Sequence, residues 1–167
     1  ELLPESGLRG ADHVLIGRQG GIERPFAALR AELAHARGSR GPVLAFGHRV
    51  VHGGTSYAAP TRVDEPVMTE LAKLVPLAPL HQPHNLAPIA AILEAAPHLP
   101  QIACFDTAFH ATRSPVEQAY ALPQPLRDAG VRRYGFHGLS YEHIAGVLPL
   151  HLGALASGRV VVAHLGN

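Results

Sequence analysis

Cysteine and charge are both scarce in this sequence. Cys104 is the only cysteine among 167 residues, so no disulfide can form within one chain, and its apolar neighbours favour a small buried residue over a nucleophile. Charged residues make up 16% of the chain and the formal net charge is +1. The basic residues are scattered, and no row of aromatic residues accompanies them. The electrostatic attraction of such a chain for the phosphates of a nucleic acid is too weak for binding. We therefore expect no nucleic-acid partner.

Long hydrophobic runs and targeting segments are also missing. No apolar stretch approaches the length of a transmembrane helix, and no signal peptide opens the chain. Together with the single cysteine, these features predict a cytoplasmic protein without membrane association. The sequence begins at Glu1 and not at methionine, which indicates processing, a cloning boundary or a fragment.

Signatures of zinc sites and of phosphate-binding loops are absent as well. The chain has 12 histidines but neither HExxH nor CxxC. Three histidine pairs raise the question of zinc: His48/His52, His81/His84 and His110/His137. The first pair has the i,i+4 spacing of a helix but lies in a strand-like run. Nothing matches a Walker loop, and Gly53-Gly54 is too short to count. We predict no dedicated zinc site, and no residue is assigned as a metal ligand.

Apolar segments alternate between strand-like and helical patterns. Strands are predicted at residues 13–17, 42–51, 101–105 and 159–165. Helices are predicted at residues 25–37, 66–75, 86–96 and 141–148, with Asn85 and Ser140 as N-caps of the last two. This alternation favours an α/β fold. The segment 112–133 is rich in turn residues and is the best candidate for a junction between two structural units.

Polar side chains stand at the ends of apolar strands, where ligands bind in open α/β sheets. Arg49 lies inside one such run, and two interpretations stay open: a buried pair with a carboxylate, or capture of a substrate anion. Asp106 ends another run. It is either a turn or N-cap aspartate, or a carboxylate that orients a nucleophile or holds a metal through water.

Three histidines complete the set of candidates: His81, His137 and His164. A lone histidine is usually a satisfied structural residue. However, His137 precedes Gly138 and His164 lies near Gly166, and glycines allow a ligand to approach the backbone closely. The neighbouring glycines therefore favour both histidines as ligand-binding residues.

Five segments together carry a specific resemblance: FGHRVVHGG, LAPLHQPHNL, FDTAFH, YGFHGLSYEHIA and VVAHLGN. They occur in this order in the acetate kinase family, which the chain resembles from about His13 to Asn167; propionate and butyrate kinases are relatives. The resemblance implies an α/β, ribonuclease-H-like fold of the acetate and sugar kinase/Hsc70/actin superfamily, in truncated form. It implies residues 1–111 as a partial N-terminal acyl-substrate domain, and 112–167 as the junction and the start of the nucleotide-binding domain.

The resemblance also implies roles for individual residues. The implied catalytic residues are Arg49, Asp106 and His137. The implied substrate-binding residues are Arg49, Val51, Leu80, His81 and Phe136, of which Val51, Leu80 and Phe136 line a pocket for the substrate methyl group. The implied phosphate-contacting residues are His164, Gly166 and Asn167.

The implied reaction moves a phosphoryl group between ATP and acetate, with magnesium as cofactor and a homodimer as the working unit. Phosphoryl transfer needs alignment and charge stabilisation, and a carboxylate substrate needs no strong general base. The family's N-terminal phosphate turn and C-terminal nucleotide-binding part have no counterpart here, so we expect a fragment that is inactive alone. Leu139 and Tyr141 depart from the family's commoner FHGTSH wording.

Alternatives of other classes stay open at this point. The parent enzyme could prefer propionate or butyrate over acetate. The chain could be a non-catalytic remnant that dimerises or binds small anions, for which a strictly monomeric, compact species would count against dimerisation. It could also be a histidine-rich metal-binding protein, an idea that elemental analysis without zinc or nickel would remove.

Overall fold

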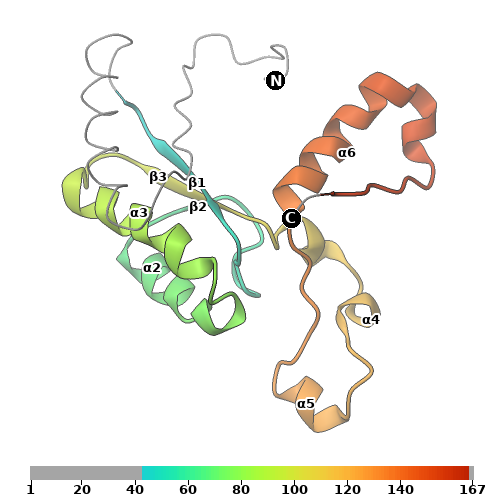
Figure 1. The fold of residues 1–167 in the computed structure, drawn as a ribbon, viewed down its shortest axis with the longest axis horizontal. Coiled ribbons are helices and arrows are strands. Elements are labelled where there is room, and N and C mark those ends of the chain that lie inside the picture. Colours follow the sequence, from blue (N-terminus) through green and yellow to red (C-terminus); the bar gives the residue numbers. More distant parts are fainter. Residues whose placement is uncertain (1–42, 166–167) are drawn as a thin grey trace. The chain divides into compact units, whose positions relative to one another are not determined.

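The computed structural model describes residues 43–165, and a small sheet lies at their centre (Figure 1). Its strands are β1 (Phe46–Val50), β2 (Thr61–Arg62) and β3 (Gln101–Phe105), in the order β1-β3-β2. β1 runs parallel to β3, and β2 runs antiparallel to β3. The strand predicted at 101–105 is confirmed residue for residue. The one predicted at 42–51 is confirmed over residues 46–50, whereas the two-residue β2 was not predicted.

Two helices pack with the sheet around the core. They are α2 (Glu65–Ala72) and α3 (Gln82–Ala95); α3 contacts both β1 and α2. The core consists of Val50, Val63, Leu71, Leu86, Ile89, Ala103 and Phe105. Burial alternates along β3, where residues 101, 103 and 105 are buried and residues 102 and 104 are half-buried. One face of β3 therefore belongs to this core, as the period of two along a strand requires.

The start of α2 follows the expected chemistry, whereas that of α3 does not. Asp64 caps α2 by accepting the Val67 N–H at 2.9 Å, and the helix is followed by a 3₁₀ turn, η1 (Val75–Leu77). The prediction of Asn85 as the N-cap of the next helix is wrong, because α3 begins at Gln82 with a proline in its first turn. The Asn85 side chain instead accepts the Val51 N–H at 2.9 Å.

The predicted turn-rich segment contains two short helices, α4 (Pro115–Gln118) and α5 (Gln124–Asp128). It follows the 3₁₀ helix η2 (Phe109–Thr112). After it comes α6 (Gly138–Leu152), longer than the predicted helix at 141–148, and then η3 (Gly153–Ser157). Ser140 is not its N-cap, a prediction that is wrong: His137 occupies that position. The predicted domain boundary at residues 111/112 stays a prediction.

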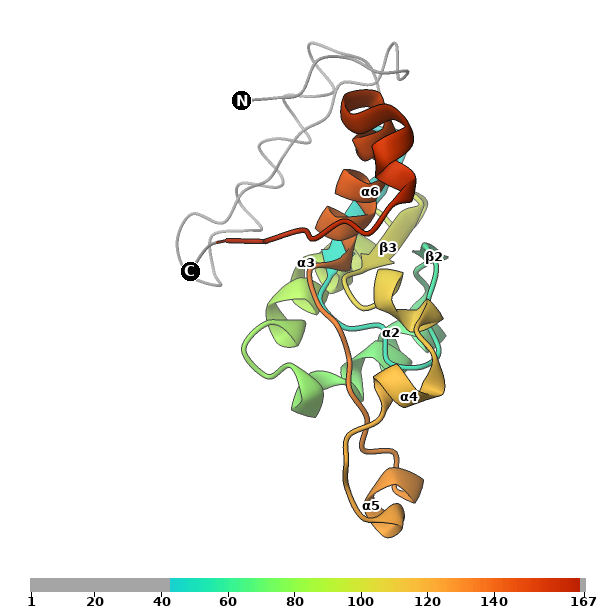
Figure 2. The same ribbon diagram turned by 90° about the vertical axis from the view of Figure 1, so that its right-hand side faces the viewer.

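The predicted strand at 159–165 is wrong for the described residues. They are drawn as a tube without an arrow in Figure 2 and carry no regular structure. Val161 is 94% exposed and Leu165 is 90% exposed. A β-strand needs a neighbour for its ladder of hydrogen bonds, and among residues 43–165 the sheet order leaves this segment without one.

Some expectations fall outside the described part of the chain. The strand predicted at 13–17 and the helix predicted at 25–37 both precede residue 43. Within residues 43–165, none of the helices combines the length and the apolar character that crossing a membrane would require.

Candidate active site

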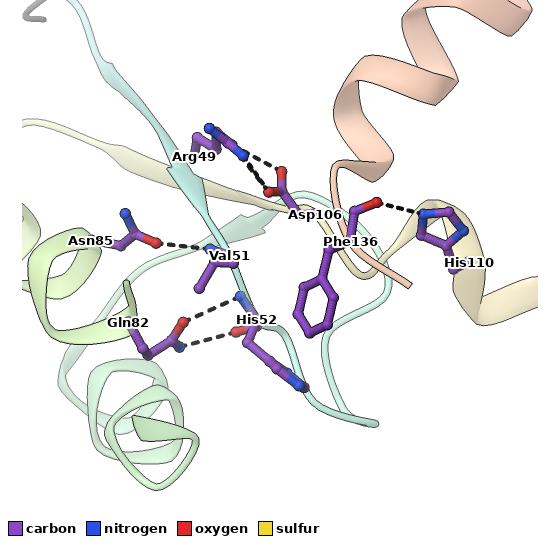
Figure 3. Close-up of polar contacts among 8 residues, drawn as sticks. All are labelled: Arg49, Val51, His52, Gln82, Asn85, Asp106, His110 and Phe136. Carbon is purple, nitrogen blue, oxygen red and sulfur yellow. Dashed lines mark hydrogen bonds and ion pairs between the residues drawn. The ribbon is translucent and has the colours of Figure 1, made fainter. Parts of the chain in front are cut away.

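The parallel pairing of β1 and β3 places Arg49 beside Asp106. Val50 lies opposite Phe105 in the sheet register, and the Asp106 N–H donates to the Val50 carbonyl at 3.0 Å. From this position the Arg49 side chain reaches the carboxylate at two points (Figure 3). Its Nε donates to Oδ1 at 3.0 Å and to Oδ2 at 3.1 Å, and its Nη2 donates to Oδ2 at 2.6 Å.

The two members of this ion pair differ greatly in exposure. The Asp106 side chain is 1% exposed, whereas the Arg49 side chain is 64% exposed. The hydrogen bonds to Asp106 raise the pKa of the Arg49 guanidinium, so it stays charged. The two interpretations of Arg49 are therefore compatible: a buried carboxylate fixes one edge of the guanidinium, and most of the side chain still faces outward, where an anion could reach it.

The backbone around Asp106 brings His137 to the same place. The Gly138 N–H, at the start of α6, donates to the Asp106 carbonyl at 2.8 Å. A Cβ at position 138 would lie 2.1 Å from that carbonyl oxygen, so only glycine allows the approach. His137 precedes it in the left-handed conformation, with φ of 56°. The side chain of Arg49 is thus bonded to Asp106, and His137 is linked to Asp106 through the backbone of Gly138.

His110 holds the segment that leads into His137. Its Nε2 lies 2.9 Å from the Phe136 carbonyl oxygen, and a Cβ at position 135 would lie 2.3 Å from the His110 ring (Figure 3). Glycine at 135 thus lets the chain pass over the imidazole. The sequence suggested His110 only as a possible zinc partner of His137, and the structure gives it a hydrogen bond to the backbone.

His164 also lies near His137. Their ring centroids are 4.4 Å apart, and the His164 ring lies 6.0 Å from that of Tyr141. Tyr141 in turn packs against Phe109 and His110. The predicted phosphate-contacting residues Gly166 and Asn167 lie outside the described residues.

The residues predicted to line the acyl pocket are only partly assembled. Val51 is 8% exposed at the end of β1, and Phe136 is 39% exposed. Leu80 is 77% exposed and His81 is also exposed, in the turn before α3. Leu80 and His81 are linked to the site by the residues that follow them in α3: the side chains of Gln82 and Asn85 hydrogen-bond to the backbone just after β1.

Two polar residues at the start of α3 were missed by the sequence analysis. The fully buried Gln82 accepts the His52 N–H at 3.2 Å and donates to the His52 carbonyl at 3.0 Å and to the Leu71 carbonyl at 3.2 Å. Asn85 accepts the Val51 N–H. These amides therefore fix the backbone directly after Arg49 and Val50. Their only sequence signal is a pair of amides in the proline-containing run HQPHNL.

A metal site is not formed by the described residues. Among residues 43–165 there is no group of three or more histidine, cysteine or acidic side chains that could hold a metal ion. Both carboxylate oxygens of Asp106 already accept hydrogen bonds from Arg49. The described residues therefore do not fit a magnesium site.

Cys104 is half-buried instead of fully buried as expected. It lies on a cleft of about 320 Å³ whose lining includes Pro60, Cys104, Phe105, Phe109, Leu139 and Glu142. Burial, and to a smaller extent the charge of Glu142, raise the pKa of the thiol. A thiol that stays protonated is a poor nucleophile.

Comparison with known proteins shows the family of this chain. Residues 14–167 match the family model described as the Acetokinase family. This chain belongs to the acetokinase family. It is 51% identical over 166 residues to an acetate kinase of Methylocella silvestris, a match that covers 95% of this chain and 40% of that protein.

Solved structures of family members have the same fold. The crystal structure of acetate kinase from Entamoeba histolytica superposes with a TM-score of 0.69 at 32% identity, covering 86% of this chain and 36% of that one. A propionate kinase from Francisella tularensis gives a TM-score of 0.69 at 33% identity, covering 76% and 33%. The expected α/β kinase fold is confirmed. The chain spans about two fifths of the length of the Methylocella relative.

Proposed function

We propose that this chain forms the acyl-substrate side of a kinase that transfers a phosphoryl group between ATP and a short carboxylate, with acetate as the first candidate. The observation that carries the proposal is the two-point contact of Arg49 with Asp106, in which the carboxylate is buried and the guanidinium is largely exposed. A guanidinium with one edge fixed can present its other donors to a substrate carboxylate without first losing rotamer freedom.

Each proposed role follows from charge and position. Arg49 binds the substrate carboxylate, or the acetyl phosphate formed from it. Asp106 holds the guanidinium in place, and no group need remove a proton because the substrate is already an anion. The imidazoles of His137 and His164 donate to the oxygens of the transferring phosphoryl group, where charge develops.

The remaining proposed roles concern the pocket and the phosphates. Val51, Leu80 and Phe136 line the space for the methyl group, with His81 beside it. Gly166 and Asn167 contact phosphate. ATP and magnesium stay predictions for the whole protein, since this chain spans about two fifths of its Methylocella relative. The described residues do not form a metal site. The division into an acyl-substrate part up to residue 111 and a second part after it is likewise a proposal.

Binding measurements on the 167-residue chain test this proposal. We expect acetate and acetyl phosphate to bind in isothermal titration calorimetry, and Arg49→Gln to weaken binding at least about tenfold, since a charged hydrogen bond contributes about 1.5–3 kcal/mol. Arg62→Gln, which alters an exposed arginine of β2, is the matched control and should bind like the parent. Equal binding by all three proteins would contradict the assignment of Arg49.

Turnover is a separate question from binding. We propose that the 167-residue polypeptide alone makes little or no acetyl phosphate from ATP and acetate, because it spans only about two fifths of the length of its Methylocella relative. A hydroxamate assay with ATP and acetate measures this directly. Hydroxamate formation at about 1 s⁻¹ or faster, within the usual range for enzymes, would contradict it.

The identity of the acid is a second open choice. The propionate kinase superposes on this chain as well as the acetate kinase does. A titration with acetate, propionate and butyrate decides between them. A chain that binds inorganic phosphate but none of the three acids would instead be a small-anion-binding remnant.

The proposed homodimer and cytoplasmic location also stay predictions. Several large apolar side chains are exposed on the described surface, among them Leu150, Leu155 and Val161. Sedimentation velocity over a range of protein concentrations measures self-association. A single monomeric species at all concentrations would contradict a dimer of this chain.

A further inference from the structure

His52 is a buried histidine that plays no part in the reaction proposed above. It follows Val51 at the end of β1 and is fully buried. Both its backbone N–H and its backbone carbonyl are bonded to the Gln82 side chain. The backbone of His52 is therefore fixed on both sides of its Cα, and the position of the imidazole is set by this backbone and by the contacts of the ring.

The hydrogen bonds of the ring define its tautomer. The Gly54 N–H donates to Nδ1 at 2.9 Å, so Nδ1 carries no proton. Burial lowers the pKa of His52, which keeps the ring neutral and its single proton on Nε2. Nε2 is buried and has no hydrogen-bond partner among the described residues. A buried donor of this kind needs an explanation.

Two aromatic rings from the segment leading into His137 lie against this imidazole. The Tyr134 ring centroid is 4.4 Å away and the Phe136 ring centroid is 5.6 Å away, both at steep interplanar angles (Figure 3 shows Phe136). Edge-to-face contacts of this kind stabilise ring pairs, and an N–H group can donate weakly to a π face. The Arg132 guanidinium makes a cation–π contact with Tyr134, with its Cζ 5.7 Å from the ring centroid.

We propose that His52 is a specificity-determining residue: its ring forms the back wall against which Phe136 rests, and so sets the length of acyl chain that the site accepts. This inference rests on the function proposed above, because it assumes that Val51 and Phe136 face the acyl group. His52 touches Phe136 on one side and follows Val51 in the chain. Its volume therefore determines how far the Phe136 ring can retreat from the substrate.

Ring volume and hydrogen bonding can be separated by two substitutions. His52→Asn keeps an acceptor near the Nδ1 position for the Gly54 N–H but shortens the side chain, leaving space behind Phe136. His52→Phe keeps a ring of similar size but removes the acceptor. If the ring is the wall, only His52→Asn should open the pocket to longer acids.

Dissociation constants of the full chain for acetate, propionate and butyrate test this. We expect His52→Asn to lower the butyrate-to-acetate ratio of dissociation constants about threefold to tenfold, because one methylene group in an apolar pocket is worth about tenfold or more. His52→Phe should keep the ratio within about twofold of the parent. His98→Asn, an exposed histidine after α3, is the matched control and should not change it.

The outcomes separate the two proposals. If the parent chain binds acids but His52→Asn changes all three constants by the same factor, or if both variants shift the ratio equally, His52 is not the wall. If the parent binds none of the acids, both proposals fail. Circular dichroism checks folding. Should His52→Asn unfold, Tyr134→Leu serves as a second variant: it removes a ring that packs against His52 at 4.4 Å and is expected to shift the ratio in the same direction.

A spectroscopic measurement addresses the ring without any ligand. Long-range ¹H–¹⁵N spectra of the histidine rings, with His52 assigned by its absence in His52→Phe, report the tautomer. We expect a bare Nδ1 and a protonated Nε2. A proton on Nδ1 would contradict the arrangement with Gly54 from which the inference starts.

Discussion

Gly138 offers the sharpest test of how the site is assembled. Its N–H donates to the Asp106 carbonyl, and a Cβ there would lie 2.1 Å from that oxygen and 2.9 Å from the Cβ of Phe109. Gly138→Ala must therefore push α6 away from the end of β3. Overpacking of this kind costs about 1–3 kcal/mol. For a chain of this size that corresponds to a fall in Tm of about 2–4 °C per kcal/mol.

The same helix provides a control with the opposite sign. Gly146 lies within α6 and a Cβ there meets nothing within 4 Å. Gly146→Ala should therefore stabilise the chain by about 0.5–1 kcal/mol, the usual advantage of alanine over glycine inside a helix. Thermal and urea unfolding, followed by circular dichroism, measure both variants. Equal Tm changes, or a Gly138→Ala protein as stable as the parent, would refute the close contact between α6 and Asp106.

Three further predictions concern the polar contacts. Arg49→Ala should lower the free energy of unfolding by about 2 kcal/mol in the parent. In an Asp106→Asn background it should lower it by less than about 1 kcal/mol, because that background has already lost the charged partner of Arg49. Equal costs of Arg49→Ala in the two backgrounds, measured by urea unfolding, would show that the pair is not coupled. Gln82→Leu should cost about 3 kcal/mol, because buried backbone groups at His52 lose their partners at about 1–3 kcal/mol each; an unchanged urea midpoint would contradict the clamp. Burial lowers the pKa of both His48 and His52 below 6.5. Just below pH 6.5 the unfolded chain therefore binds more protons than the folded chain, so the free energy of unfolding should fall as the pH decreases from about 7 to 5.5. This fall should be smaller in a His48→Gln/His52→Phe variant, and an identical dependence of the unfolding free energy on pH in the two proteins would contradict the assignment.

The parts of the fold that followed from the sequence have strong local signals. Residues 101–105 form a short apolar run, and the polar residue at its end marks the edge of the sheet. Arg49 is conspicuous because arginine rarely lies in such a strand. A buried pair of Arg49 with a carboxylate was one interpretation of the sequence, but its partner was not named; the parallel pairing of β1 with β3 identifies it as Asp106.

The parts that did not follow depend on contacts distant in sequence. Asn85 has a good capping side chain, but in the fold its amide oxygen accepts the Val51 N–H, directly after β1, and α3 begins earlier. The run at 159–165 has high β-propensity, yet propensity forms no strand without a neighbour to pair with. The clamp by Gln82 joins residues 30 positions apart, and no local pattern predicts it.

One measurement tests the central claim most directly, that a short carboxylate binds where Arg49, Asp106 and His137 meet. Acetate labelled with ¹³C in its methyl group can be titrated into the chain and its contacts read as intermolecular nuclear Overhauser effects. We expect contacts from the acetate methyl to the Phe136 ring and the Val51 methyl groups, and their loss in Arg49→Gln. Contacts to other parts of the chain, or contacts unchanged by Arg49→Gln, would contradict the account.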